Sequence, residues 1–242
     1  MYWKFRTYVN IHGPSVGIGA GISAAVTIAV FFGFSLITNQ PEITLEPAEI
    51  SQPEPSDVTL SVFTANSSPY LGSKDATITL VEFGDYQCFF CNKFFHETEE
   101  ALFQNYVDTG KVKVIFKDFT IIGPDSINAA HGAHCANDQG MFWEYHDILY
   151  NNWDGENNGW AASENLLGFA KEINLDIDEW SQCMLDARHQ QKIVDSNNDA
   201  RTLGLTGTPG FFIIGPDNYV TKIDGAQPYD VFEQIFESEL AK

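Results

Sequence analysis

Two cysteines separated by two residues, Cys88 and Cys91, have the type and spacing for redox chemistry. This spacing brings both sulfurs within bonding reach, so a mixed disulfide formed at Cys88 can be resolved by Cys91. At the start of a helix, free N–H groups and the positive end of the helix dipole stabilise a thiolate on the first cysteine. Such a position lowers a cysteine pKa from about 8.5 to roughly 3.5–7. The pair therefore favours thiol–disulfide exchange.

The same pair could also be half of a zinc site or a structural disulfide. Zinc needs two more ligands at suitable spacing, and the sequence has neither a second C-x-x-C nor an H-x-x-x-H. A structural disulfide across so short a loop gains little, because the entropic gain grows with loop length. Both interpretations are weaker than a redox role.

The segments around the pair are of the kind that would place it at a helix start. Residues 77–83 are mostly apolar or β-branched, which predicts a buried strand that ends at the following Gly-Asp pair. Residues 88–109 then have helical composition, and residues 111–117 predict a second strand. Because the connection is this long, the two strands should be parallel, with a right-handed crossover.

The C-terminal half predicts a helical insertion followed by a hairpin and a last helix. Patterns from about residue 125 to residue 203 are helical. Residues 211–214 and 219–223 alternate around a Gly-Pro-Asp-Asn turn, and residues 229–240 carry an apolar stripe. The expected N-caps of the insertion helices are Asp125 with Ser126, Ser163 and Asp178. The predicted layout is βαβ, insertion, ββα, which is an α/β fold.

The N-terminal part predicts a membrane anchor. Residues 15–38 carry no charged side chain and are long enough to cross a bilayer core of about 30 Å. The tail before them, residues 1–14, contains Lys4 and Arg6, so the positive-inside rule places the tail in the cytoplasm and the following domain outside. A cleaved signal peptide is the alternative, but the apolar run is long for one and no A-x-A-like site follows it. We expect an uncleaved signal-anchor with one transmembrane helix.

The remaining chain divides into a linker and one domain. Residues 39–68 are rich in Pro and Glu, which predicts an extended linker, although residues 58–63 alternate enough for a short strand. Residues 69–242 would form the domain, with the insertion at about 124–203. The 242-residue chain has a formal net charge of −20, which argues against a nucleic-acid surface and fits an acidic domain outside the cytoplasm.

Four segments carry a resemblance to a known family. The run V-E-F-x-D-Y-x-C-x-x-C at 81–91 resembles the thioredoxin-fold proteins of the DsbA family, especially the branch with membrane-anchored, BdbD-like members. Segments 129–136, 141–147 and 204–212 are similar to the same branch and occur in the same order. The resemblance, which covers residues 69–242, implies a thioredoxin fold with an inserted α-helical subdomain and protein thiol:disulfide oxidoreductase activity.

The resemblance also implies roles for residues away from the cysteines. Thr208-Pro209 could be an ordinary turn, but the likeness implies a cis-proline facing the disulfide, where the Thr208 backbone pairs with an extended substrate. Glu82, on the central strand, would be buried with a raised pKa and would exchange a proton with the second cysteine. The other interpretation is a carboxylate that reaches water or pairs with Lys113 or Lys117.

Phe89 and Phe90, between the cysteines, depart from the family, in which the first of these residues is often Pro. In the family this dipeptide tunes the redox potential, so the departure leaves the redox potential of this pair open. It does not affect the assignment of thiol–disulfide exchange. Phenylalanines on an exposed first turn beside a reactive thiol are expected to form an apolar patch that binds unfolded polypeptide.

Cys135 and Cys183 fall on two insertion helices and could be buried free thiols. An even cysteine count outside the cytoplasm favours a bond, and the BdbD-like branch has cysteines at similar places. His131 and His134 beside Cys135 could suggest a metal site, but helical ligands with no further complement more often pack or face solvent. We expect a structural disulfide and no metal.

Together these observations predict a membrane-tethered, extracytoplasmic dithiol oxidase without a cofactor. It would act, as a monomer, on exported proteins with free thiols and be re-oxidised by a membrane DsbB-like or VKOR-like quinone reductase; no nucleic acid is expected as a partner. One alternative is an outward-facing disulfide reductase or isomerase. The other, of a different class, is a thioredoxin-like copper-delivery protein, which would need a wider C-x-x-x-C and a distal histidine ligand.

Overall fold

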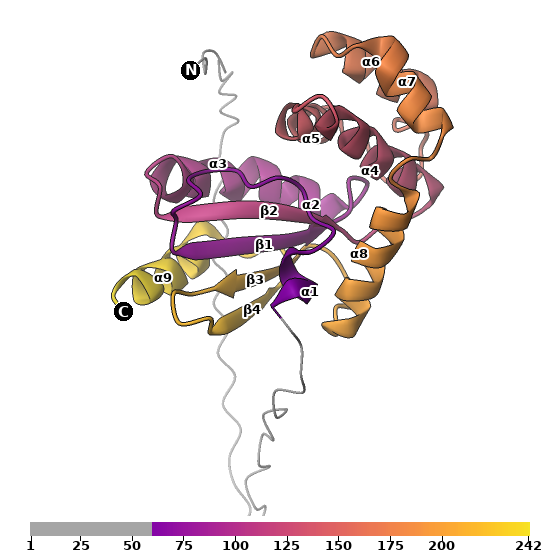
Figure 1. The fold of residues 1–242 in the computed structure, drawn as a ribbon. Coiled ribbons are helices and arrows are strands. Elements are labelled where there is room, and N and C mark those ends of the chain that lie inside the picture. The colour runs from indigo at the N-terminus through magenta and orange to yellow at the C-terminus, as the bar shows by residue number, and fades with distance from the viewer. Residues whose placement is uncertain (1–59) are drawn as a thin grey trace, which may run out of the picture. The chain divides into compact units, whose positions relative to one another are not determined.

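The computed structural model describes residues 60–242, and their fold is built around a four-stranded sheet (Figure 1). β1 runs parallel to β2 and antiparallel to β3, and β3 forms a hairpin with β4. This is the predicted α/β arrangement, and it puts the strand that leads into the cysteine pair inside the sheet. In the order in which they lie across the sheet, the strands are β2 (Val112–Asp118), β1 (Ile78–Gly84), β3 (Gly210–Ile214) and β4 (Val220–Asp224).

A continuous helical run begins at the cysteine pair and covers one face of the sheet together with α9 (Tyr229–Leu240). Leu80 of β1, Phe94 of the run and Phe236 of α9 belong to one buried cluster on this face. Two turns of the run are π-helical, which the sequence pattern does not predict. The run consists of α2 (Phe89–Phe94), η1 (Phe95–Glu99), α3 (Glu100–Leu102) and η2 (Phe103–Val107).

The opposite face of the sheet is covered by α8 (Gln190–Thr202) and by the short helix α1 (Ser61–Thr64) (Figure 1). Val81 of β1 packs there in one buried cluster with Phe63 of α1 and Ala200 of α8. Apolar side chains therefore cover both faces of β1, which accounts for the unbroken apolar run in its sequence.

The predicted helical insertion is present. Its buried residues form a core that also contains Cys88 and Cys91, so the insertion packs directly against the start of α2. The buried aromatic residues Tyr145 and Trp180 belong to the same core. The insertion consists of α4 (Pro124–Asn137), α5 (Phe142–Asn151), α6 (Ser163–Glu172) and α7 (Ile177–Leu185), and α8 leads back from it to the sheet.

Two expectations for the segment before β1 were wrong. The residues expected to form a short strand include the start of α1, and residues 60–68, assigned to the linker, pack on the domain. The Phe63 ring lies 5.0 Å from that of Phe212, and the Lys117 ammonium donates to the carbonyl oxygens of Val62 at 2.8 Å and Ala65 at 2.5 Å. These contacts with distant residues determine the local structure, and a six-residue alternation cannot reveal them.

The helix caps also differ from those predicted. Asp176, not Asp178, caps α7, and its carboxylate accepts the N–H three residues further on at 3.0 Å. Gly123 is the N-cap of α4, and the Ser126 hydroxyl, in the first turn, accepts the Gly123 N–H at 3.3 Å. Ser163 is the first residue of α6 and not its cap. Each helix begins within two residues of the predicted position, so the fold is unaffected.

The predicted transmembrane helix at 15–38, the tail 1–14 and most of the linker lie outside the described residues. Within residues 60–242, no helix combines the length and the apolar character needed to cross a membrane.

Candidate active site

Cys88 and Cys91 lie where β1 turns into the helical run, the position that their spacing predicts. Cys88 is the N-cap of α2, with an extended backbone (φ −68°, ψ 125°), and its N–H donates to the Asp85 carbonyl at 2.9 Å. Cys91 lies in the first turn of the helix and is completely buried, whereas Cys88 is 5% exposed. Both are free thiols, so the structure represents the dithiol form of the pair.

The two thiols differ in acidity. The pKa of Cys88 is lowered from 9.0 to about 6, chiefly by a hydrogen bond from the Cys91 side chain. Thr208 and the N–H groups of Cys91 and Phe90 also lower this pKa, whereas burial raises it. Burial is the largest effect that raises the pKa of Cys91 well above its ordinary value, followed by its interactions with Cys88 and Glu82. At neutral pH the pair therefore consists of a Cys88 thiolate and a Cys91 thiol, which suits Cys88 as the nucleophile and Cys91 as the resolving thiol.

Glu82 is a buried carboxyl group on the same face of β1 as the helical run. It is 3% exposed, and because side chains alternate along a strand it shares this face with Leu80. Burial, and after it the charge of Cys88, raise the pKa of Glu82 from 4.5 to about 8. A carboxyl group that titrates near neutral pH and interacts electrostatically with Cys91 can accept and return the proton of that thiol.

The register of the sheet excludes both lysines considered as partners of Glu82. Lys113 and Lys117 lie opposite odd-numbered residues of β1, so their side chains leave the other face of the sheet. Lys113 donates instead to the Lys74 carbonyl oxygen at 3.2 Å, and Lys117 forms a salt bridge of 2.7 Å with Asp199. Glu82 is thus buried without either cation to offset the effect of burial on its pKa.

The Thr208–Pro209 peptide bond is cis and lies beside the pair. The Cys88 sulfur lies 3.3 Å from the Thr208 carbonyl oxygen, to which it donates a hydrogen bond only in its protonated form. Pro209 precedes β3 directly, and its carbonyl oxygen accepts the Gly225 N–H at 2.9 Å. A polypeptide joined to Cys88 by a mixed disulfide would therefore meet the Thr208 backbone at the start of a strand, where backbone pairing is possible.

Phe89 and Phe90 are exposed beside the cysteines, as their position predicts. Their side chains are 50% and 54% exposed, and the two rings lie 5.3 Å apart in an edge-to-face arrangement. The Phe89 ring is also 5.9 Å from that of Trp153, in the loop between α5 and α6. Exposed aromatic rings next to a reactive thiol form an apolar surface suited to unfolded polypeptide.

Asp85 holds the turn before Cys88, a role that the sequence suggests only as far as a turn residue. Its carboxylate accepts the N–H of Gln87 at 2.9 Å, of Ile121 at 2.8 Å and of Ile122 at 3.0 Å. Burial raises the pKa of Asp85, and these hydrogen bonds oppose that effect. The carboxylate thereby ties the active-site turn to the segment that leads into α4.

Gln87 is a residue of the site that sequence reasoning missed. It is completely buried; its amide nitrogen donates to the Ser126 hydroxyl at 3.0 Å and its amide oxygen accepts the Asn157 N–H at 2.8 Å. Its backbone carbonyl accepts the indole N–H of Trp153 at 2.8 Å. The only sequence signal was its place immediately before Cys88, because the partners of its side chain and carbonyl oxygen are 39 to 70 residues away.

Comparison with known proteins agrees with this site. The profile of the family described as "Thioredoxin" matches residues 64–237, which include both cysteines and the cis-proline. The chain belongs to the thioredoxin family.

Individual similar proteins include disulfide bond formation proteins and DsbA proteins. "Probable disulfide bond formation protein D" of Bacillus anthracis is 30% identical over 158 residues, which cover 64% of this chain and 73% of that protein. The crystal structure of alpha-DsbA1 from Wolbachia pipientis has a TM-score of 0.63 and 28% identity, covering 70% of this chain and 89% of that one. "Na(+)/H(+) antiporter NhaA 1" of Salinispora arenicola is 31% identical over 146 residues, but the chain spans only 21% of its length. The thioredoxin-family chain is thus a DsbA-like protein thiol:disulfide oxidoreductase.

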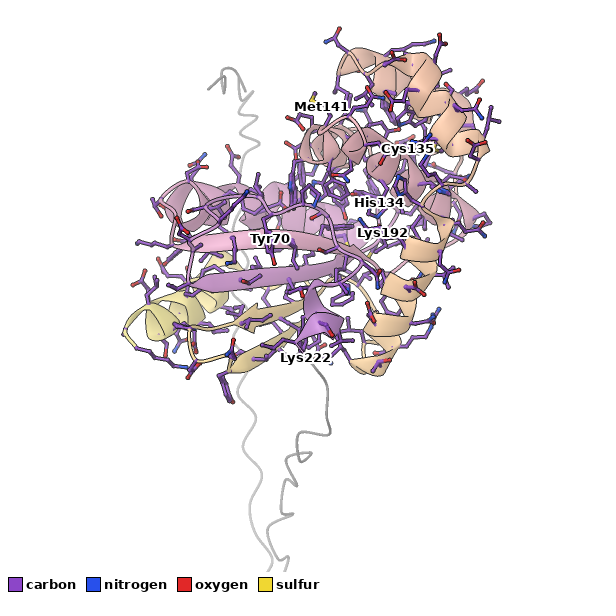
Figure 2. The ribbon with its side chains drawn as sticks, in the orientation of Figure 1. Tyr70, His134, Cys135, Met141, Lys192 and Lys222 are labelled. Carbon is purple, nitrogen blue, oxygen red and sulfur yellow. A yellow bond between two sulfur atoms is a disulfide. The ribbon has the colours of Figure 1, made fainter. Side chains whose placement is uncertain are left out.

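The thioredoxin-family chain also contains a second cysteine pair, which forms a disulfide. Cys135 of α4 and Cys183 of α7 are bonded, with 5.8 Å between their Cα atoms (Figure 2 labels Cys135). The sulfur atoms lie within 4.8 Å of a ring nitrogen of His189, but the bond occupies both thiolates that a metal would need.

The two histidines weighed as metal ligands next to Cys135 have other partners. The His131 ring nitrogen accepts the backbone N–H of His189 at 3.0 Å. His134 lies 2.7 Å from the Asp118 carboxylate in a buried pair, where α4 meets the end of β2 (Figure 2). Both side chains therefore serve packing and hydrogen bonding between α4 and the residues beside the insertion.

Proposed function

We propose that this DsbA-like chain is a membrane-tethered dithiol oxidase that introduces disulfides into exported proteins. The observation that carries the proposal is the lowered pKa of Cys88, about 6. A thiolate stabilised in the dithiol form makes the disulfide form relatively less stable, so the disulfide tends to be passed to another protein. Stabilisation of the thiolate by the Cys91 thiol and by N–H groups supports an oxidising pair.

The proposed reaction starts from the Cys88–Cys91 disulfide. A substrate thiolate attacks the Cys88 sulfur, and Cys91 leaves as a thiolate that takes a proton from the Glu82 carboxyl, because the pKa of Cys91 is well above that of Glu82. A second substrate thiolate then attacks the substrate sulfur of the mixed disulfide and releases the Cys88 thiolate. The substrate loses two electrons and the pair gains them.

Substrate docking is assigned to the surface around Cys88. The exposed rings of Phe89 and Phe90 would contact apolar side chains of an unfolded chain without sequence specificity. The backbone at Thr208 and the cis-proline would pair with the same chain and present its thiol to Cys88. Both contacts suit exported proteins that are not yet folded.

The tether and the location rest on the sequence. The uncharged segment 15–38 and the preceding basic residues support an anchor with the catalytic domain outside the cytoplasm, where disulfides persist. A membrane quinone reductase of the DsbB-like or VKOR-like kind would then re-oxidise the pair. Fusion of a reporter active only outside the cytoplasm to the C-terminus tests this orientation, and an inactive reporter would contradict it.

The direction of electron flow is tested by the redox state of the pair in the cell. Acid quenching followed by alkylation and mass analysis gives the fraction of Cys88–Cys91 disulfide, and equilibration with glutathione gives the potential. We expect mostly disulfide and a potential well above −270 mV, the value of the reducing thioredoxins. A pair that is mostly dithiol and near −270 mV would establish an outward-facing reductase instead.

A further inference from the structure

The loop between α5 and α6 places a carboxylate on the first residue of the active-site helix. The Phe89 N–H, which follows Cys88 directly, donates to Glu156 Oε1 at 3.0 Å. Glu156 is 67 residues from Phe89 in sequence and is exposed to solvent. Nothing in the exchange reaction described above uses this side chain.

Other contacts of the same loop fix the position of Glu156. On one side of it, the Trp153 indole donates to the Gln87 carbonyl at 2.8 Å. On the other side, the Asn157 N–H donates to the Gln87 amide oxygen at 2.8 Å and the Asn157 side chain donates to the Ile122 carbonyl at 3.3 Å. Trp153 and Asn157, on either side of Glu156, thus bind the active-site turn and the segment beside it. Glu156 is therefore held over the start of α2.

A carboxylate at this position competes with the Cys88 thiolate for the same electrostatic stabilisation. The thiolate is stabilised by the N–H groups of Phe90 and Cys91, which belong to the same first turn. Glu156 occupies the neighbouring N–H and adds a second negative charge at the positive end of the helix. Two negative charges at one helix terminus repel each other, so the thiolate is less stable than it would be alone.

We propose that Glu156 is a positioning residue that limits the oxidising power of the Cys88–Cys91 disulfide. By repelling the Cys88 thiolate, its charge destabilises the dithiol form relative to the disulfide and makes the pair a weaker oxidant. The proposal rests on the exchange function of the pair but not on its direction, because a reductase with the same site would be tuned in the same sense.

The test compares variants that separate the charge of Glu156 from its hydrogen bond. Glu156→Gln keeps an acceptor oxygen for the Phe89 N–H and removes the charge, whereas Glu156→Ala removes both. Glu164→Gln removes a charge that is also exposed, at the start of α6, and is the matched control. The readouts are the Cys88 pKa, from thiolate absorbance, and the equilibrium constant with glutathione, at low and at 1 M salt.

Glu156→Gln is expected to lower the Cys88 pKa and to shift the equilibrium towards the dithiol by roughly two- to fivefold, the size of a single-charge effect at an exposed helix terminus. The shift should shrink at 1 M salt, where the Debye length is about 3 Å. No shift in Glu156→Gln, or a shift only in Glu156→Ala, would overturn the proposal, because the loop hydrogen bond and not the charge would then matter. The potential of the unaltered protein tests the oxidase function separately.

Discussion

Glu82 of β1 lies directly opposite Phe116 of β2 in the parallel register, and Phe116 belongs to the buried cluster that contains both active-site cysteines. Because of this register, the Glu82 carboxyl group lies on the face of the sheet where the thiols lie, among apolar side chains. This is the physical origin of its pKa of about 8.

The raised pKa of Glu82 predicts how the stability of the dithiol form depends on pH. The unfolded chain loses this proton near pH 4.5 and the folded protein near pH 8, so folding is progressively disfavoured as pH rises between these values. Glu82→Gln cannot ionise and should be more stable than the unaltered protein above pH 8, by up to about 5 kcal/mol for a shift of this size. Urea unfolding at pH 5 and pH 8.5 measures this; an equal difference at both pH values would contradict it.

Glu82→Gln should also slow the chemistry, because the amide cannot give a proton to the departing Cys91 thiolate. We expect reduction of the disulfide form by a thiol peptide at pH 7 to slow by at least about tenfold. Stopped-flow fluorescence, with Trp153 near the site as the reporter, gives this rate. Glu99→Gln, a change at another buried glutamate of the helical run, is the control. An unchanged rate would remove Glu82 from the reaction.

The unequal thiols predict selective alkylation of the reduced protein. Because its pKa is lowered to about 6, Cys88 should react with iodoacetamide at a rate that rises with pH around a midpoint near 6 and is nearly constant above pH 7. Cys91 should remain unmodified on the same time scale, since it is completely buried and its pKa is raised. Peptide mass mapping distinguishes the two sites. Equal, slow labelling of both would refute the assignment of Cys88 as the nucleophile.

The Cys135–Cys183 bond should stabilise the fold without taking part in exchange. Its closure of a loop with a sequence separation of 48 residues corresponds to roughly 4 kcal/mol of chain entropy, so replacing both cysteines by alanine should lower the unfolding free energy by about that amount. The bond should also survive mild reduction that opens Cys88–Cys91, because structural disulfides have lower potentials. Mass mapping that finds free thiols at Cys135 and Cys183 in freshly isolated protein would contradict this.

The sequence predicted those parts of the site that depend on local spacing. The position of Cys88 at a helix start follows from a strand, a turn and a helical segment in succession, all within about 35 residues. The face on which Glu82 lies did not follow, because it depends on the pairing of β1 with β2. Once that register is known, Lys113 and Lys117 are excluded as partners by side-chain alternation alone.

The residues that the sequence did not reveal act through partners far along the chain. Gln87 and Glu156 carry no motif, and their roles arise because the loop between α5 and α6 folds back onto the active-site turn. The segment expected to form a strand became α1 for a similar reason, since Lys117 binds the carbonyl oxygens of Val62 and Ala65. Propensity over a few residues is too weak to outweigh such contacts.

The exposed rings of Phe89 and Phe90 predict a difference between large and small substrates. Changing both residues to serine removes the apolar surface beside Cys88, so the KM for an unfolded polypeptide with free thiols should rise, by roughly tenfold if each ring contributes about 0.7 kcal/mol of burial. Reaction with glutathione, which is too small to cover the patch, should change much less. Tyr219→Ser, a change at a ring that is 62% exposed in the turn between β3 and β4, is the control. Equal losses with glutathione and with polypeptide would mean that the two rings affect the thiol and not the docking of the chain.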